Sequence, residues 1–89
     1  MNHKTVTIIN KLGLHARAAA KFVQAASGFH AEINVHSGHR EVNGKSIMGI
    51  MMLAAGMGSE IEIKAIGPDE DDAMSALTAL INDKFGEDE

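Results

Sequence analysis

Three short segments of this chain alternate apolar and polar residues with a two-residue period, which is the pattern of half-buried β-strands. They cover residues 5–9, 31–36 and 60–65. A shorter segment over residues 40–42 returns after a turn at residues 36–39 and predicts one more strand. Because one face of such strands is apolar and the other polar, we expect an antiparallel sheet with helices on one face and water on the other.

Helical periodicity fills the segments between these strands. Residues 16–27 predict a first helix that ends at Gly28, and Ser46 caps a short second helix whose apolar run ends at residues 56–58. Asp69 is predicted to cap a third helix that runs up to Gly86. The predicted order is β-α-β-β-α-β-α. The expected buried positions are Ala16, Ala19, Ala20, Val23 and Ala26 in the first helix and Ala73, Met74, Leu77, Leu80 and Ile81 in the third.

Composition excludes several classes of protein. Eighty-nine residues predict a single domain over 1–89, and the absence of cysteine excludes disulfides and thiolate metal sites. No apolar run approaches the ~20 residues of a membrane span, and the amino terminus lacks a signal-peptide core, so we expect a cytoplasmic protein without membrane insertion. Three phenylalanines, no tryptophan, no tyrosine and a net charge of −4 argue against nucleic-acid binding.

Charge is distributed unevenly along the chain. Residues 1–66 contain seven basic and four acidic side chains, whereas residues 67–89 contain one basic and eight acidic ones. A mildly basic body favours docking to acidic partner surfaces. We expect the acidic tail to be solvated.

His15 lies where a predicted strand leads into a predicted helix. The first backbone N–H groups of a helix have no partner within it and point outward with the positive end of the dipole, so they suit an oxyanion. The same positive end disfavours a charged imidazolium and favours a neutral, nucleophilic ring. Arg17 adds a planar, permanently charged donor for phosphate. A histidine here can therefore carry a phosphoryl group, although a solvent-exposed cap without chemistry has the same local sequence.

The segment KLGLHAR at residues 11–17 resembles the active-site motif of the HPr family, the histidine-containing phosphocarriers of the bacterial phosphoenolpyruvate-dependent phosphotransferase system. The segment VNGKSIMGIMML at residues 42–53 resembles the family's regulatory serine segment, and the resemblance covers essentially the whole chain. It implies an α+β fold, an open-faced β-sandwich with three helices on one face of a four-stranded antiparallel sheet. The same order of elements also suits a ferredoxin-like module.

The resemblance implies that His15 is phosphorylated transiently at Nδ1 by enzyme I and passes the group to an enzyme IIA-type acceptor protein. Arg17 and the backbone N–H groups of Ala16, Arg17 and Ala18 would hold the phosphate. The protein is then a monomeric phosphocarrier rather than an enzyme. Ala18 departs from the family, which usually has proline there to fix φ in the first helical turn. We expect the site to survive with a less rigid helix start.

Ser46 has two compatible interpretations. Serine is a favoured helix cap, and the resemblance implies that an HPr kinase/phosphorylase, where present, phosphorylates this serine and weakens docking through the added charge. The short helix that follows carries more apolar surface than it needs to bury, so we expect part of it to be exposed, although such methionine stripes usually pack in a core. The resemblance places the docking surface around His15 at Ala20, Lys21, Gln24, Ile47, Met48, Met51 and Met52.

The other histidines raise the question of a metal. His36 and His39 flank a turn and could chelate weakly, but two imidazoles without carboxylate or thiolate support rarely form a dedicated site. We expect no metal and no cofactor, and we interpret these residues, with His3 and His30, as solvated side chains.

Two further functions remain open. A nitrogen-related paralogue of the phosphotransferase system would use the same chemistry in regulatory signalling without moving sugar. A non-catalytic regulatory binding module would act through Ser46 and its apolar helix, and His15 would then be incidental.

Overall fold

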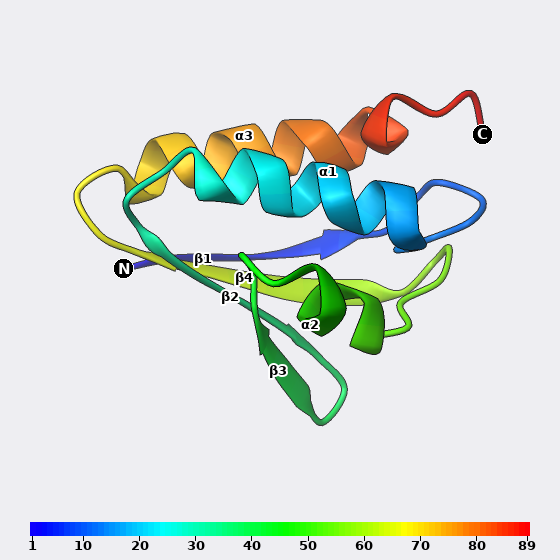
Figure 1. The fold of residues 1–89 in the computed structure, drawn as a ribbon, viewed down its shortest axis with the longest axis horizontal. Helices are drawn as coiled ribbons and strands as arrows, with labels where there is room; N and C mark the ends of the chain where they lie inside the picture. The colour runs from blue at the N-terminus through cyan, green and yellow to red at the C-terminus, as the bar shows by residue number, and fades with distance from the viewer.

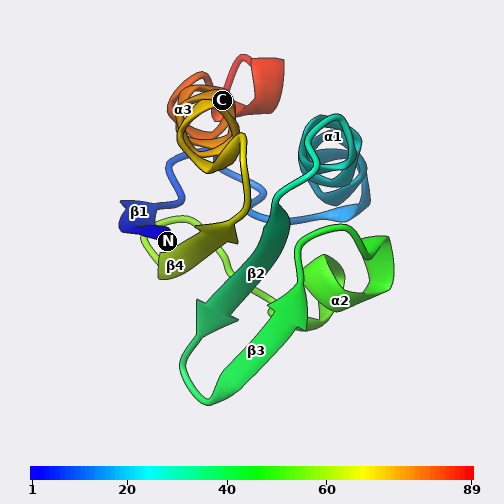
Figure 2. The same cartoon turned by 90° about the vertical axis from the view of Figure 1, so that its left-hand side faces the viewer.

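The computed structural model describes all 89 residues, which form one four-stranded antiparallel sheet with three α-helices on one face (Figures 1 and 2). The strands lie in the order β1-β4-β2-β3, and every neighbouring pair is antiparallel. The predicted fold class and order of elements are confirmed. No helix has the length and apolar character needed to span a bilayer. In chain order the elements are β1 (Asn2–Thr7), α1 (Ala16–Ser27), β2 (Glu32–Ser37), β3 (Arg40–Asn43), α2 (Ile47–Met52), β4 (Glu60–Ile66), α3 (Glu70–Asn82) and a short 3-10 helix, η1 (Lys84–Gly86).

The hydrophobic core lies between the sheet and the helices. The two central strands, β2 and β4, contribute alternate residues to it, and Val35 pairs with Ile63 in their register. The residues between them, such as Glu62 and Lys64, lie on the open face of the sheet and form the polar side predicted from the alternation. The sheet therefore contributes only one of its faces to the core, and we look for a site at the edges of this core.

The strand and helix ends differ from the predicted ones where tertiary contacts decide them. β1 begins at Asn2 rather than at residue 5, because its backbone pairs with β4 from Asn2 opposite Ala65 onward. α3 ends at Asn82, before Gly86, because the chain turns into η1 with φ of 55° at both Lys84 and Phe85. Phe85 itself is fully buried.

The buried face of α1 is rotated relative to the predicted one. Phe22 faces the core, whereas Ala16 and Ala20 are exposed and Val23 is only partly buried. The prediction was wrong for these positions because the largest apolar side chain, Phe22, determines which face of the helix packs on the sheet. The buried residues of α1 are Ala18, Ala19, Phe22 and Ala26.

Asp69 precedes α3 but its side chain does not cap the helix, contrary to the prediction. Its two carboxylate oxygens each accept a 2.8 Å hydrogen bond, from the backbone N–H groups of His30 and Ala31. The hydrogen bond from His30 is the main reason that the pKa of Asp69 lies below its ordinary value. Asp69 therefore connects the start of α3 to the chain entering β2.

Candidate functional site

His15 is the N-cap residue of α1, with extended backbone angles of φ −71° and ψ 177°. Its carbonyl oxygen accepts the first helical hydrogen bond, from Ala19 at 2.8 Å, and its side chain makes no capping bond. The backbone N–H groups of Ala16, Arg17 and Ala18 have no hydrogen-bond partner in the protein. The start of α1 therefore presents unpaired donors beside an imidazole, which is the arrangement predicted for an oxyanion site.

The loop before His15 is held in place by its backbone. Gly13 has φ +67°, and a Cβ atom there would lie 2.5 Å from the carbonyl oxygen of Ala55. Leu14 is buried and donates a 2.9 Å backbone hydrogen bond to the same oxygen of Ala55. Only glycine fits at position 13, because it combines the left-handed conformation with this close approach.

The carboxyl-terminal segment folds back over the start of α1 rather than extending into solvent. Figure 1 shows the C-terminus at the same end of the molecule as the beginning of α1. The carbonyl oxygen of Phe85 accepts a 2.6 Å bond from Lys21 Nζ, and that of Glu89 accepts a 2.5 Å bond from the backbone N–H of Lys11. The prediction of a solvated tail was wrong for Phe85, which is buried and anchors the segment to the core, and for Glu87, which is partly buried, whereas Asp88 and Glu89 are exposed.

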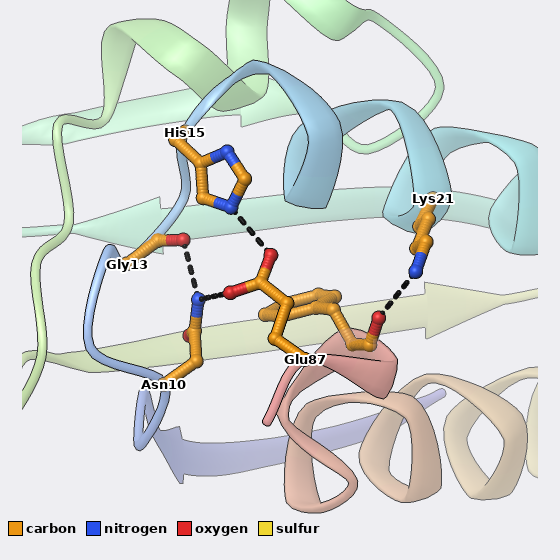
Figure 3. Close-up of polar contacts among 6 residues, drawn as sticks. Asn10, Gly13, His15, Lys21 and Glu87 are labelled. Carbon is orange, nitrogen blue, oxygen red and sulfur yellow. Dashed lines mark hydrogen bonds and ion pairs between the residues drawn. The ribbon is translucent and has the colours of Figure 1, made fainter. Parts of the chain in front are cut away.

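Glu87 is the residue that this segment brings into the site. Its Oε2 lies 2.5 Å from His15 Nε2, and its Oε1 accepts a 3.0 Å hydrogen bond from Nδ2 of Asn10 (Figure 3). Asn10 is fully buried, and its Nδ2 also donates to the carbonyl oxygen of Gly13 at 2.8 Å. Asn10 thus connects the loop before His15 to the carboxyl-terminal segment.

The carboxyl of Glu87 is ionised at neutral pH. Partial burial raises its pKa, but hydrogen bonds from Asn10 and His15 lower it, so the pKa lies below its ordinary value of 4.5. The side chains of His15 and Glu87 are 28% and 15% exposed. The His15–Glu87 pair is therefore half-buried but still reachable from solvent.

An open depression of about 710 Å³ lies beside this pair. Arg17 is exposed at its edge, so its guanidinium is available to an anion bound near His15. No group of three or more potential metal ligands is close enough together to hold an ion. The lining residues are Lys11, Leu12, His15, Ala16, Arg17, Glu87, Asp88 and Glu89.

Ser46 is the N-cap of α2, as predicted, and its Oγ accepts a 3.1 Å hydrogen bond from the backbone N–H of Gly49. α2 packs beside α1 on the same face of the sheet (Figure 2). Of the residues expected to dock partners, Lys21 is half-buried with its ammonium on Phe85, and the rest are exposed. The exposed ones are Ala20 and Gln24 of α1 and Ile47, Met48, Met51 and Met52 of α2.

Asn10 and Glu87 were missed from the sequence. Neither belongs to a periodic segment, and the acidic run at residues 87–89 is typical of a solvated tail. One signal was present, because Phe85 is a large apolar residue four positions after Ile81 and could have indicated that the chain continues along the core.

Comparisons with known proteins agree with this geometry. The family described as "PTS HPr component phosphorylation site" matches residues 2–83. The chain belongs to the HPr family. It is 57% identical to the phosphocarrier protein HPr of Neisseria meningitidis serogroup A and 54% identical to that of Cupriavidus necator, in each case over 89 residues and 100% of both chains. A crystal structure of HPr-C-His from Thermoanaerobacter tengcongensis has a TM-score of 0.96 at 49% identity and covers 100% of both chains.

Membership of the HPr family decides the fold and the phosphocarrier function, and it leaves the choice between the sugar branch and the nitrogen-related branch open. The open-faced sandwich is the HPr fold, and the ferredoxin-like alternative is set aside. The protein is an HPr phosphocarrier of the phosphotransferase system, works through a phosphorylated histidine and is not a classical enzyme. Its partners are other proteins of that system.

Proposed function

We propose that His15 is the residue that carries the phosphoryl group, receives it from phosphorylated enzyme I and passes it to an enzyme IIA-type acceptor. The observation that carries this proposal is the position of His15 at the start of α1, beside three unpaired backbone N–H groups. The other four histidines lie elsewhere: His3 in β1, His30 before β2, His36 in β2 and His39 in the turn before β3. None of them precedes a helix.

The proposed phosphate site consists of the N–H groups of Ala16, Arg17 and Ala18 and the guanidinium of Arg17. Ala16 and Arg17 line an open depression, so the phosphate stays accessible to the next protein. A carrier needs such moderate stabilisation, because a phosphoryl group bound too tightly would not be transferred onward. Most of the catalytic machinery then belongs to the partners, and the chain needs no metal or cofactor.

The proposed docking surface lies on α1 and α2 next to His15. It joins Ala20, Lys21 and Gln24 of α1 to the apolar side chains of α2, of which Met48 is 75% exposed. Exposed methionines adapt to differently shaped partners, which suits a surface that must bind enzyme I and several acceptors in turn. We also propose that the protein is cytoplasmic, as the family implies. We further propose that it is a monomer, which sedimentation equilibrium tests.

We further propose that phosphorylation of Ser46 by an HPr kinase/phosphorylase, where the organism has one, weakens docking. Ser46 lies at the start of α2, so a dianion there would stand beside the exposed methionines. Ser46→Asp should slow transfer to partners while leaving the unfolding free energy within about 0.5 kcal/mol. Transfer kinetics equal to those of Ser46→Asn, which introduces no charge, would remove Ser46 from the regulatory residues.

The phosphocarrier proposal is tested by incubation with phosphoenolpyruvate and a catalytic amount of enzyme I. The expected product is an acid-labile phosphoprotein that forms with the wild-type chain and with His39→Ala but not with His15→Ala. Phosphate uptake by His15→Ala would refute the assignment. A binding module would instead retain its binding and regulation in that variant. Onward transfer to sugar-specific or nitrogen-related acceptors then separates the sugar branch from the nitrogen-related alternative.

A further inference from the structure

The hydrogen bonds of Glu87 define which ring nitrogen of His15 carries the proton. An ionised carboxylate only accepts hydrogen bonds, so its 2.5 Å contact with His15 Nε2 requires a proton on that nitrogen. The orientation of Asn10 is fixed independently, because its Nδ2 donates to the carbonyl oxygen of Gly13 as well as to Glu87 Oε1. The direction of every hydrogen bond in this chain of contacts is therefore determined.

The other ring nitrogen, Nδ1, lies on the far side of the imidazole from Glu87 (Figure 3). It has no hydrogen-bond partner in the protein. When the ring is neutral and Nε2 carries its proton, the lone pair is on Nδ1. This nitrogen is therefore the nucleophilic one.

We propose that Glu87 is a positioning residue that holds His15 in the tautomer with its proton on Nε2 and its lone pair on Nδ1. The inference rests on the proposed function, since it concerns His15 as the phosphorylated residue. In the transfer, the Nδ1 lone pair attacks phosphorus of phosphorylated enzyme I, the bond from phosphorus to the donor atom of enzyme I breaks, and its electron pair stays on that atom.

After the transfer, the His15 ring has phosphorus on Nδ1 and hydrogen on Nε2, and it carries a positive charge. The carboxylate of Glu87 faces this charge and stabilises it. Transfer to the acceptor breaks the Nδ1–phosphorus bond and returns the neutral ring with the same proton on Nε2. No proton has to leave or enter the ring in either step.

Glu87 can do this because the chain is fixed on both sides of it. Phe85 is buried and bonded through its carbonyl oxygen to Lys21, and Glu89 is bonded through its carbonyl oxygen to the backbone of Lys11. The cationic groups around the pair are Lys11, Arg17 and Lys21, and the anionic ones are Asp88 and Glu89. The carboxylate is thus held by tertiary structure and does not depend on a free tail.

Glu87→Gln is the sharpest test because it changes the tautomer while preserving shape. Asn10 keeps the glutamine oxygen at the Oε1 position, so the new NH₂ group turns toward His15 Nε2. A donor there favours a proton on Nδ1 and removes the lone pair needed for attack. The initial rate of phosphorylation by enzyme I should fall at least tenfold, a loss smaller than the roughly 10²–10⁴-fold that a positioned proton-transfer group contributes.

The tautomer itself is read by nitrogen-15 NMR of the histidine rings at about pH 8, where an ordinary histidine is neutral. The wild-type chain should show the His15 proton on Nε2, and Glu87→Gln should show it on Nδ1. Glu62→Gln is the matched control, because Glu62 lies 3.5 Å from Nδ1 of His3 on the open side of the sheet. It should leave both the His15 signals and the phosphorylation rate unchanged.

A wild-type His15 proton on Nδ1 would overturn the inference, whether or not the variant folds. Phosphorylation of Glu87→Gln at the wild-type rate would overturn it as well. Failure of the proposed function looks different, because the wild-type chain and His15→Ala would then take up equal amounts of phosphate.

Discussion

Removal of the Asn10 side chain tests the link between the loop before His15 and the carboxyl-terminal segment. Asn10→Ala deletes a buried hydrogen bond to the carbonyl oxygen of Gly13 at 2.8 Å and a partly buried one to the carboxylate of Glu87 at 3.0 Å. A hydrogen bond to a neutral acceptor contributes about 0.5–1.5 kcal/mol and one to a charged acceptor about 1.5–3 kcal/mol. We therefore expect the free energy of unfolding to fall by about 2–4.5 kcal/mol, a large part of the ~5–15 kcal/mol typical of a domain.

The assay is urea denaturation followed by far-ultraviolet circular dichroism, since the chain has no tryptophan or tyrosine to serve as a fluorescent probe. Asn2→Ala is the matched control, because Asn2 makes a 2.8 Å side-chain bond to Asp71 in an exposed position. The control should lose no more than about 0.5 kcal/mol, as is usual for exposed substitutions. Equal decreases in the free energy of unfolding of the two variants would show that burial does not strengthen the Asn10 hydrogen bonds.

Three further predictions concern backbone geometry, pH and the helix start. Gly13→Ala should lower the free energy of unfolding by roughly 2–4 kcal/mol, more than Gly38→Ala does. Both glycines have a positive φ, but only a Cβ atom at position 13 would meet a backbone oxygen. Equal decreases of the two variants in urea denaturation would contradict this prediction. The pKa of Asp69 is lowered in the folded protein, so the ionised carboxylate stabilises the fold. This stabilisation is fully present above the ordinary pKa of 3.8 and is lost as the pH falls through the pKa of the folded state. The stability gap between wild type and Asp69→Asn should therefore shrink from about pH 6 to about pH 2, and a constant gap would argue against it. Ala18→Pro removes one of the three unpaired N–H groups, but those of Ala16 and Arg17 remain with the Arg17 guanidinium, so the phosphorylation rate by enzyme I should stay within about twofold. A larger fall would show that the two remaining N–H groups do not suffice to hold the phosphate.

The sequence was informative wherever a periodic pattern or a local cap determines the structure. The alternation in residues 31–36 and 60–65 indicates the two central strands, and Ser46 at the start of an apolar run indicates the N-cap of α2. His15 and its unpaired helix donors could be predicted for the same reason, because a helix start leaves N–H groups free regardless of the rest of the fold.

The missed features depend on contacts between distant parts of the chain. Asp69 has the sequence signature of a cap, yet its carboxylate binds the N–H groups of His30 and Ala31, which only the fold brings near. Glu87 lies 72 positions from His15 along the chain and reaches it because Phe85 is buried with a positive φ. Neither residue propensity nor hydrophobic periodicity indicates that the carboxyl-terminal segment folds back onto the start of α1, so the local pattern predicted a solvated tail.

The most direct test of the account is phosphorus–nitrogen NMR of the nitrogen-15-labelled protein after phosphorylation by phosphoenolpyruvate and enzyme I. We expect phosphorus bonded to Nδ1 of His15, with the proton still on Nε2. Phosphorus on Nε2 of that ring, or on any of the other four histidines, would contradict it.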